Sequence, residues 1–198
     1  MTLHFEFWPT LVFAVMILSW FAFVVVFLVQ EKPASTPESK RERSSIFGIA
    51  LQGLAYAIVW AIHRPPFTPI AQIGKSFEIA LAILTMTLAI GSVWFCSAAI
   101  RTLGKQWSLA ARLVEGHKLI TEGPYSVVRN PIYTGMFGML LATGLAISHW
   151  IGLLIAIVVF AMGTAIRVRS EEKLLREAFG AEFEAYARRV PAVIPFLF

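Results

Sequence analysis

Long apolar runs separated by short polar segments dominate the pattern of this chain. A helix needs about 20 mainly apolar residues to cross the roughly 30 Å hydrocarbon core of a bilayer. The pattern therefore predicts five membrane-spanning helices, over residues 8–29, 46–62, 76–100, 131–147 and 150–166. Only "SHW", residues 148–150, separates the last two runs, which leaves room for a tight turn and predicts a helical hairpin.

The first apolar run is typical of a retained helix and not of a cleaved signal peptide. It is about twice as long as the usual apolar region of such a peptide, no Lys or Arg precedes it, and no small-residue cleavage site follows it. We therefore expect residues 8–29 to remain in the protein as the first span.

Two polar segments interrupt or follow these runs. Residues 31–44 are rich in Pro, Ser and charge, which is typical of a flexible connector, and we assign them no chemistry. The tail from Arg167 to Arg189 alternates charged and apolar residues at spacings of three and four, which predicts an amphipathic helix interrupted near Gly180. On pattern alone, such a helix lies on a membrane surface.

Composition supports a single membrane domain over residues 1–198. The chain is 58% hydrophobic and 15% charged, and its mean hydropathy is +0.72. Cys96 is its only cysteine, so neither a disulfide framework nor a cysteine-based zinc site is available. The net charge of +5 then indicates basic loops that face anionic lipid, and we expect no nucleic acid partner.

The basic residues predict an orientation. Fifteen of the 17 Lys and Arg lie in residues 30–45, 101–130 and 167–189, and only Arg64 and Lys75 lie elsewhere. Because basic loops favour the cytoplasm, five spans place the N-terminus outside and the C-terminus inside, in the inner membrane if the source is prokaryotic.

Polar and charged residues are concentrated on this predicted cytoplasmic side, in "EGPYSVVRNPIYTG", residues 122–135, and "RVRSEE", residues 167–172. Asn130 and Pro131 form a helix start, in which Asn caps backbone N–H groups and Pro suits the first position. The same helix start, with Arg129 beside it, is suited to hold a carboxylate or phosphate. Both interpretations stay open.

Arg167 and Glu171 are four residues apart and therefore share a helix face, either as an ordinary ion pair or as a site where the fifth span ends. Tyr125 and Tyr133 suit a membrane interface. His117 has no second histidine at metal-ligand spacing, so we expect no metal. No Gly-rich dinucleotide or phosphate loop is present, so a nucleotide-like cofactor would need another kind of site.

Two longer stretches carry a resemblance to a known family. They read "LGKQWSLAARLVEGHKLITEGPYSVVRNPIYTG", residues 103–135, and "RVRSEEKLLREAFGAEFEAYARRVPAVIPF", residues 167–196. Both resemble the C-terminal core of the isoprenylcysteine carboxyl methyltransferases, and more distantly the membrane phospholipid methyltransferases. The resemblance implies an all-α membrane protein with three N-terminal spans in residues 1–100 and a catalytic core in 101–198.

The resemblance also implies a cofactor, S-adenosylmethionine, bound without a Rossmann fold between the loop that leads into the hairpin and the tail helix. The positions that match the family's cofactor contacts are Arg112, His117, Lys118, Leu119, Ile120, Tyr125, Asn130, Pro131, Ile132, Tyr133 and Glu171. We add Arg129 as a cofactor-binding candidate because it lies beside the same helix start. Where the family reads Arg-His-Pro, this chain has Asn130, which cannot become cationic.

Arg167 matches the arginine that the family would turn toward the methyl acceptor, and with Glu171 it forms the expected catalytic pair. We expect Arg167 to hold the carboxylate of a lipophilic acceptor such as an isoprenylcysteine, which would reach the site sideways between spans. In the same hypothesis Glu171 binds a donor group of the cofactor, and the helix start at Asn130 binds the cofactor's carboxylate.

Two alternatives stay open at this point. An N-methyltransferase for a phospholipid amine would need a general base, for which Glu171 or Glu172 is the candidate. The other alternative is a non-catalytic membrane scaffold or small transporter. Transporters tend to carry polar residues at mid-span, whereas here the spans are nearly free of charge, with Glu78 near one end of the third.

Overall fold

The computed structural model describes residues 6–29, 38–41, 44–65, 67–68, 74–108, 112–114 and 118–194, and for 38–41 and 112–114 it describes the backbone alone. The described part contains six α-helices, two short 3₁₀ helices and one antiparallel pair of strands. In chain order they are α1 (Phe7–Leu28), β1 (Glu38–Arg41), α2 (Ser44–Ala61), α3 (Lys75–Leu103), η1 (Gly104–Gln106), β2 (Arg112–Val114), η2 (Gly123–Ser126), α4 (Pro131–Ile147), α5 (Trp150–Phe179) and α6 (Ala181–Ala187).

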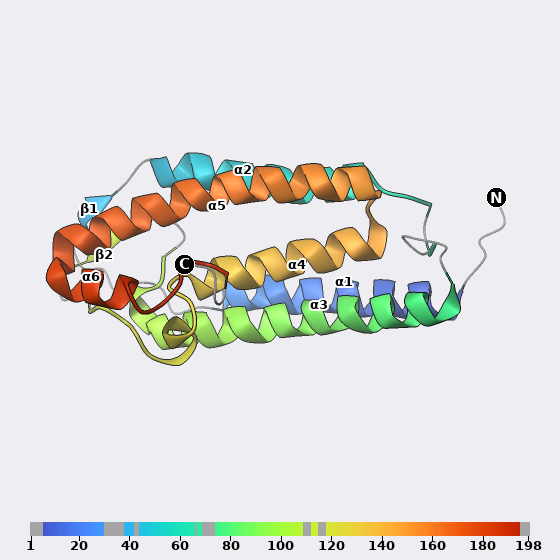
Figure 1. The fold of residues 1–198 in the computed structure, drawn as a ribbon, viewed down its shortest axis with the longest axis horizontal. Coiled ribbons are helices and arrows are strands. Elements are labelled where there is room, and N and C mark those ends of the chain that lie inside the picture. The colour runs from blue at the N-terminus through green and yellow to red at the C-terminus, as the bar shows by residue number, and fades with distance from the viewer. Residues whose placement is uncertain are drawn as a thin grey trace.

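The five long helices run lengthwise in alternating directions (Figure 1). α2 packs along α5, and α4 packs along α3 with α1 beside it. The start of α1 lies at one end of the molecule, together with the turns α2–α3 and α4–α5, whereas α6, the two strands and the loop before α4 lie at the opposite end. Four of the helices, α1, α2, α3 and α5, are long and apolar enough to cross a membrane, as the sequence predicts.

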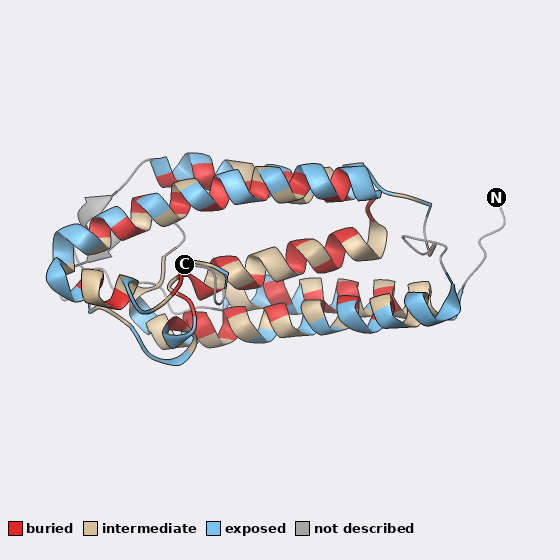
Figure 2. Ribbon diagram, in the orientation of Figure 1, coloured by how far each residue is buried: buried red, intermediate tan, exposed pale blue. Residues whose placement is uncertain are grey.

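The fourth predicted span, α4, differs from the other four because it is short and central. Its 17 residues extend over only ~25 Å, less than the hydrocarbon core of a bilayer. None of its residues is exposed, because α1, α2, α3 and α5 all contact it (Figure 2). The predicted boundaries of this helix are confirmed, but it is shorter than a helix that crosses the whole hydrocarbon core.

The fifth predicted span and the tail helix form one continuous helix. α5 passes without a break through Ile166, where the sequence predicts the end of the span, and reaches Phe179. Gly180 then stops it with a φ of +50°, a conformation that favours glycine, so the predicted interruption is confirmed. The prediction of a separate helix that begins at Arg167 was wrong because no residue between Ile166 and Phe179 breaks the helical pattern.

Part of the predicted connector between the first two spans forms a strand, which the sequence pattern did not predict; most of the rest of it lies outside the described residues. Its residues Glu38–Arg41 pair as β1 with β2, Arg112–Val114, in an antiparallel register. The sequence pattern does not indicate this pairing because each strand is short and depends on a distant partner. The pair links the α1–α2 connection to the loop that leads into α4.

The hairpin prediction for α4 and α5 is confirmed, and Arg64 holds its turn. Arg64 Nη1 donates to the carbonyl of Ser148 at 2.5 Å, and Nη2 donates to Ala146 at 2.7 Å and to Leu145 at 2.8 Å. A guanidinium satisfies carbonyls that a helix end leaves without partners. Burial lowers the pKa of Arg64 to about 10, so it remains a cation at neutral pH.

A close approach between α2 and α5 brings the polar part of α5 against α2. A Cβ atom on Gly48 would lie 2.5 Å from Arg167 Cγ and 2.7 Å from the carbonyl oxygen of Gly163, and one on Gly163 would lie 2.8 Å from the carbonyl oxygen of Gly48. Only glycine permits this separation, as is common where helices pack inside membranes. The stem of Arg167 therefore lies directly on the backbone of α2.

Candidate functional site

A cavity of about 590 Å³ lies at the end of the bundle where α4 begins and α5 leaves the apolar layer. Its wall is formed by parts of α1, α2, α5 and α6, by Leu103 at the end of α3, by the loop from Gln106 to Tyr125 and by the start of α4. Most of the wall is apolar or aromatic. Phe27 of α1 and Trp107, whose ring centroids lie 6.0 Å apart, form part of it.

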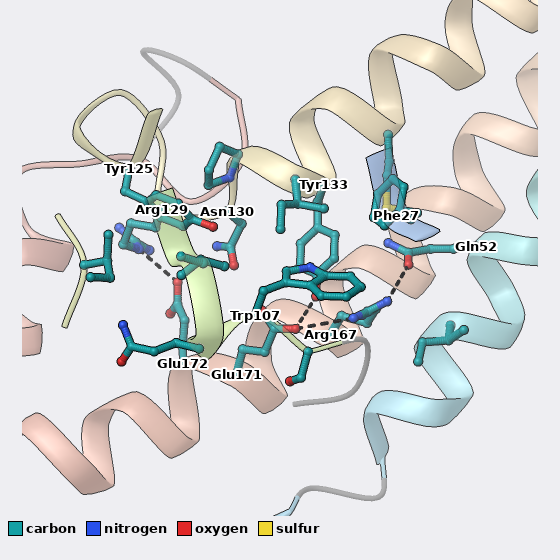
Figure 3. Close-up of a pocket in the computed structure, with 18 of the residues that line it drawn as sticks. Phe27, Gln52, Trp107, Tyr125, Arg129, Asn130, Tyr133, Arg167, Glu171 and Glu172 are labelled. Atoms are coloured by element: carbon teal, nitrogen blue, oxygen red, sulfur yellow. Dashed lines mark hydrogen bonds and ion pairs between the residues drawn. The ribbon is translucent and has the colours of Figure 1, made fainter. Parts of the chain in front are cut away.

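Arg167 is the central polar side chain of this cavity, and it is only 5% exposed (Figure 3). Its Nη2 lies 3.6 Å from Oε1 of Glu171, and its Nη1 donates to Oε1 of Gln52 at 3.3 Å. The guanidinium carbon lies 4.8 Å from the centre of the Tyr133 ring, within the range of a cation–π contact. A carboxylate, an amide oxygen and an aromatic face thus compensate the buried charge.

Tyr133 and Glu171 complete the cluster. The hydroxyl of Tyr133 donates to Oε1 of Glu171, the same oxygen that faces Arg167. Tyr133 lies in the first turn of α4, and Arg167 and Glu171 lie one turn apart on α5, so the cluster joins the two helices of the hairpin. The sequence prediction that Arg167 and Glu171 share a face is confirmed, and the side chain of Glu171 keeps 29% of its surface exposed.

Arg129, a cofactor-binding candidate, bonds to other groups of the protein itself. Its Nε donates to Glu172 Oε1 at 2.9 Å, and its Nη1 donates to the carbonyls of Ala187, at 2.7 Å, and Val190. The other carboxylate oxygen of Glu172 accepts from Arg176 at 3.0 Å. Arg129 therefore ties the loop before α4 to α5 and α6.

Asn130 does not cap α4 with its side chain, contrary to the sequence prediction. Its Nδ2 instead donates to the carbonyl of Ala192 at 3.0 Å, and its backbone N–H donates to the same carbonyl at 2.9 Å. The backbone N–H of Arg129 donates to Pro191 at 2.8 Å. Because the chain near its C-terminus lies against the helix start, the side chain bonds that segment and not the first turn of α4.

Tyr125 is buried, and Tyr186 of α6, which also lines the cavity, holds it in place. The Tyr186 hydroxyl donates to the carbonyl of Tyr125 at 2.6 Å. Burial raises the pKa of Tyr186 to about 12 and raises the pKa of Tyr125 well above its usual value. Both phenols are therefore neutral at physiological pH, and Tyr186 remains a donor.

Most of the residues that the family resemblance singles out lie around this one cavity. Its wall includes Lys118, Leu119, Ile120, Tyr125, Arg129, Asn130, Pro131, Ile132, Tyr133, Arg167 and Glu171. Arg112 lies in β2, where the structure describes the backbone alone, and His117 lies outside the described residues. Within the described part of the chain, no group of His, Cys, Asp and Glu side chains is arranged to hold a metal.

Sequence reasoning missed the part of the wall that the first two helices supply. Gln52 and Tyr56 of α2 and Phe23 and Phe27 of α1 line the cavity, although the resemblance does not extend to these helices. For the aromatic residues no signal was available, since aromatic residues are common in spans. Gln52 had a signal, because it is the one amide side chain in the second apolar run and such groups are costly there.

Comparison with known sequences identifies the class of protein. Residues 80–182, more than half of the chain, match the family described as phospholipid methyltransferase, so the chain belongs to this family of membrane methyltransferases. This confirms the resemblance carried by residues 103–135 and 167–196.

Individual relatives are similar over half of the chain or somewhat more. Protein-S-isoprenylcysteine O-methyltransferase B of Arabidopsis thaliana is 35% identical over 101 residues, which cover 50% of this chain and 51% of the relative. The protein-S-isoprenylcysteine O-methyltransferase of Saccharomyces cerevisiae is 32% identical over 130 residues, 62% of this chain and 54% of the relative. Nickel-cobalt-cadmium resistance protein NccN of Alcaligenes xylosoxydans xylosoxydans is 33% identical over 115 residues, 57% of this chain and 53% of the relative. The chain thus spans about half the length of these relatives.

Proposed function

We propose that this protein transfers a methyl group from S-adenosylmethionine to the carboxylate of a lipophilic acceptor such as an isoprenylcysteine. The observation that carries the proposal is Arg167, a buried cation in a largely apolar cavity within a helical membrane bundle. A guanidinium can hold a carboxylate with two parallel hydrogen bonds. The names of the relatives from Arabidopsis thaliana and Saccharomyces cerevisiae support the same acceptor class.

The residues around the cavity fit S-adenosylmethionine. The volume of about 590 Å³ lies within the range of roughly 300 to 1,000 Å³ that small-molecule sites occupy. Lys118 and Glu171 offer charged partners to an amino-acid group, and Trp107 offers a flat surface to a base. The cofactor would supply a methyl group already activated on a sulfonium, so a carboxylate acceptor needs no general base.

The side chains would then divide the work between binding and positioning. Arg167 would hold the acceptor carboxylate, and Glu171, whose orientation Tyr133 fixes, would accept a hydrogen bond from the cofactor. The backbone N–H groups of Arg129 and Asn130 already donate to the segment at 191–192, so we favour Lys118 over the start of α4 as the partner of the cofactor's carboxylate.

A lipid acceptor would reach the cavity from the side. Val24 of α1 is 45% exposed, Gly53 of α2 is also exposed, and both line the cavity. A residue that borders a cavity and the outer surface of a span marks a place where the cavity meets the lipid. The apolar tail of the acceptor would lie between α1 and α2 while its carboxylate reaches Arg167.

We also propose that all five long helices cross the bilayer, with the cavity end in the cytoplasm. The start of α1 and the end of α5 lie at opposite ends of the molecule, as five crossings require. The loops at the cavity end include the three basic regions of the sequence, and basic loops favour the cytoplasm.

The second candidate function is methylation of a phospholipid amine, which the description of the family favours. An amine must lose a proton before it attacks, so this reaction needs a general base. Glu172 already binds Arg129 and Arg176, whereas Glu171 lies beside Arg167 in the cavity and is partly exposed. Glu171 is therefore the better candidate for this base.

The experiment compares purified wild-type protein with Arg167→Ala. We expect the wild type to transfer labelled methyl from S-adenosylmethionine to a prenylcysteine analogue and not to phosphatidylethanolamine. Arg167→Ala should abolish this turnover while calorimetry in detergent still detects cofactor binding. Arg169→Ala, an exposed arginine on the same helix, is the control and should remain active.

Three results would contradict the proposal in different ways. Methylation of phosphatidylethanolamine alone would favour the amine reaction. Loss of cofactor affinity in Arg167→Ala would contradict the division of roles between Arg167 and Glu171. Absence of S-adenosylmethionine binding to the wild type would favour a non-catalytic membrane protein.

A further inference from the structure

Gln52 is a buried amide between α2 and α5 that has a hydrogen-bond partner at each end. It is 2% exposed and lies outside the residues, 80–182, that match the family. Its Oε1 accepts from Nη1 of Arg167 at 3.3 Å, and its Nε2 donates to Oγ1 of Thr164 at 2.9 Å. A polar side chain buried in a membrane helix is costly unless its donors and acceptors are satisfied, so the presence of an amide at this position indicates a role for it.

Arg167 decides which end of the amide faces it, and the bond to Thr164 holds the other end in place. The oxygen and nitrogen of a glutamine can exchange places by rotation of the amide, and the neighbouring groups decide the orientation. The guanidinium is only a donor, so it requires the amide oxygen. With Oγ1 of Thr164 as acceptor for the nitrogen, the oxygen is directed toward Arg167.

Gln52 carries no charge, which favours the binding of an anionic acceptor to Arg167. Arg167 already lies 3.6 Å from one carboxylate, that of Glu171. A second carboxylate on α2 would compensate the guanidinium further and weaken its attraction for a ligand carboxylate. An amide oxygen orients Nη1 without adding a negative charge.

We propose that Gln52 and Thr164 act as positioning residues that hold the guanidinium of Arg167 toward the acceptor carboxylate. Thr164 orients the amide of Gln52, and Gln52 orients Arg167. This inference rests on the proposed function, because it needs Arg167 to bind the acceptor. It assigns to α2, a helix outside the family match, a part in the recognition of the acceptor.

The test is a double-mutant cycle with Gln52→Leu and Thr164→Val, and with Thr164→Ser as the matched control that keeps the hydroxyl. Steady-state kinetics with a prenylcysteine analogue give kcat and KM for the acceptor, and calorimetry gives the Kd for S-adenosylmethionine. We expect Gln52→Leu to lower kcat/KM about tenfold, mainly through a higher KM. A tenfold loss is the size expected when one hydrogen bond to a charged group is removed. Thr164→Val should lower kcat/KM about threefold, whereas Thr164→Ser, which keeps the hydroxyl, should have the wild-type kcat/KM.

The double variant should be no worse than Gln52→Leu alone, because Thr164 acts through Gln52. The Kd for S-adenosylmethionine should stay at the wild-type value in all variants. Additive losses of kcat/KM in the double variant, or equal losses in Thr164→Ser and Thr164→Val, would overturn the proposal that Thr164 acts through Gln52. An unchanged KM together with weaker cofactor binding would show a merely structural role and would also overturn it.

The same measurements separate this inference from the proposed function. If the wild type methylates the carboxylate acceptor and Gln52→Leu equals it, only the positioning role is lost. If the wild type does not methylate that acceptor, the proposed acceptor class is lost, and the positioning role is lost with it.

Discussion

Arg129 and Glu172 form an ion pair of 2.9 Å that joins the loop before α4 to α5, with side chains 14% and 9% exposed. Glu172→Gln should lower the free energy of unfolding by about 2 kcal/mol, because Arg129 would keep its carbonyl partners but lose its compensating charge. Thermal melting in detergent measures this effect. The control is Glu184→Gln, which breaks a pair with Arg176 that is about half exposed on both sides and should cost under about 1 kcal/mol. Equal shifts in the two variants would contradict a structural role for Glu172.

Gly48→Ala should separate α2 from α5. The new Cβ would lie 2.5 Å from Arg167 Cγ and 2.7 Å from the carbonyl of Gly163, so the helices must move apart. We expect a loss of about 1 to 3 kcal/mol in thermal stability together with a large loss of activity, since Arg167 would move away from Gln52. Gly53→Ala on the same helix is the control for stability alone, because nothing lies within 4 Å of its Cβ position although Gly53 lines the cavity. A Gly48→Ala variant as stable as Gly53→Ala would mean that the two helices can separate without cost.

Asn130→Asp should loosen the segment that covers the start of α4. The amide that donates to Ala192 becomes a carboxylate, which cannot donate and would face the same carbonyl. Hydrogen exchange of the backbone N–H groups of Arg129 and Asn130, which donate to Pro191 and Ala192, should therefore become faster.

Two further variants show whether the donor is what matters at position 130. Asn130→His keeps an N–H donor and should protect the same amides, as expected for the residue that the resembled family has at this position. The hydroxyl of Ser126 donates to the nearby Gly123 carbonyl, so Ser126→Ala should leave the exchange unchanged. Faster exchange in Asn130→His equal to that in Asn130→Asp would contradict the role of the donor.

Tyr186 should give the protein an alkaline limit of stability. Its pKa is raised to about 12 in the folded protein, mainly by burial, from about 10 in an unfolded chain. A raised pKa means that folding favours the neutral phenol, so this contribution is complete below pH 10 and is lost as the pH rises from about 10 to 12. The melting temperature of the wild type should exceed that of Tyr186→Phe by a constant amount up to about pH 9, and the difference should shrink above pH 10. A difference that does not depend on pH would show that the Tyr186 hydroxyl keeps its usual pKa.

The helices and one pair of the site could be predicted from local patterns. Apolar runs predict α1 to α4 within a few residues, and the four-residue spacing predicts the pairing of Arg167 with Glu171. Both depend on neighbours in the same helix. The end of α5 was missed because charged residues mark the edge of a membrane layer without ending a helix.

The remaining contacts of the site depend on tertiary packing and have no local signal. Gln52 reaches Arg167 only because glycines let α2 and α5 come close. Asn130 suits a helix cap by local rules, but the carbonyl of Ala192 lies within reach and accepts its donor instead. A sequence rule that knows only the helix start cannot decide between these two partners.

The continuity of α5 gives the bilayer itself an influence on the site. At 30 residues the helix is ~45 Å long, so it exceeds the hydrocarbon core and carries Arg167 and Glu171 beyond its apolar half. Helices adapt to thicker or thinner membranes by tilting. Because no hinge lies between the apolar half of α5 and Arg167, a tilt that follows the thickness of the lipid also moves the guanidinium relative to Tyr133 on the central helix α4. The thickness of the lipid bilayer is therefore expected to change the geometry of this cavity.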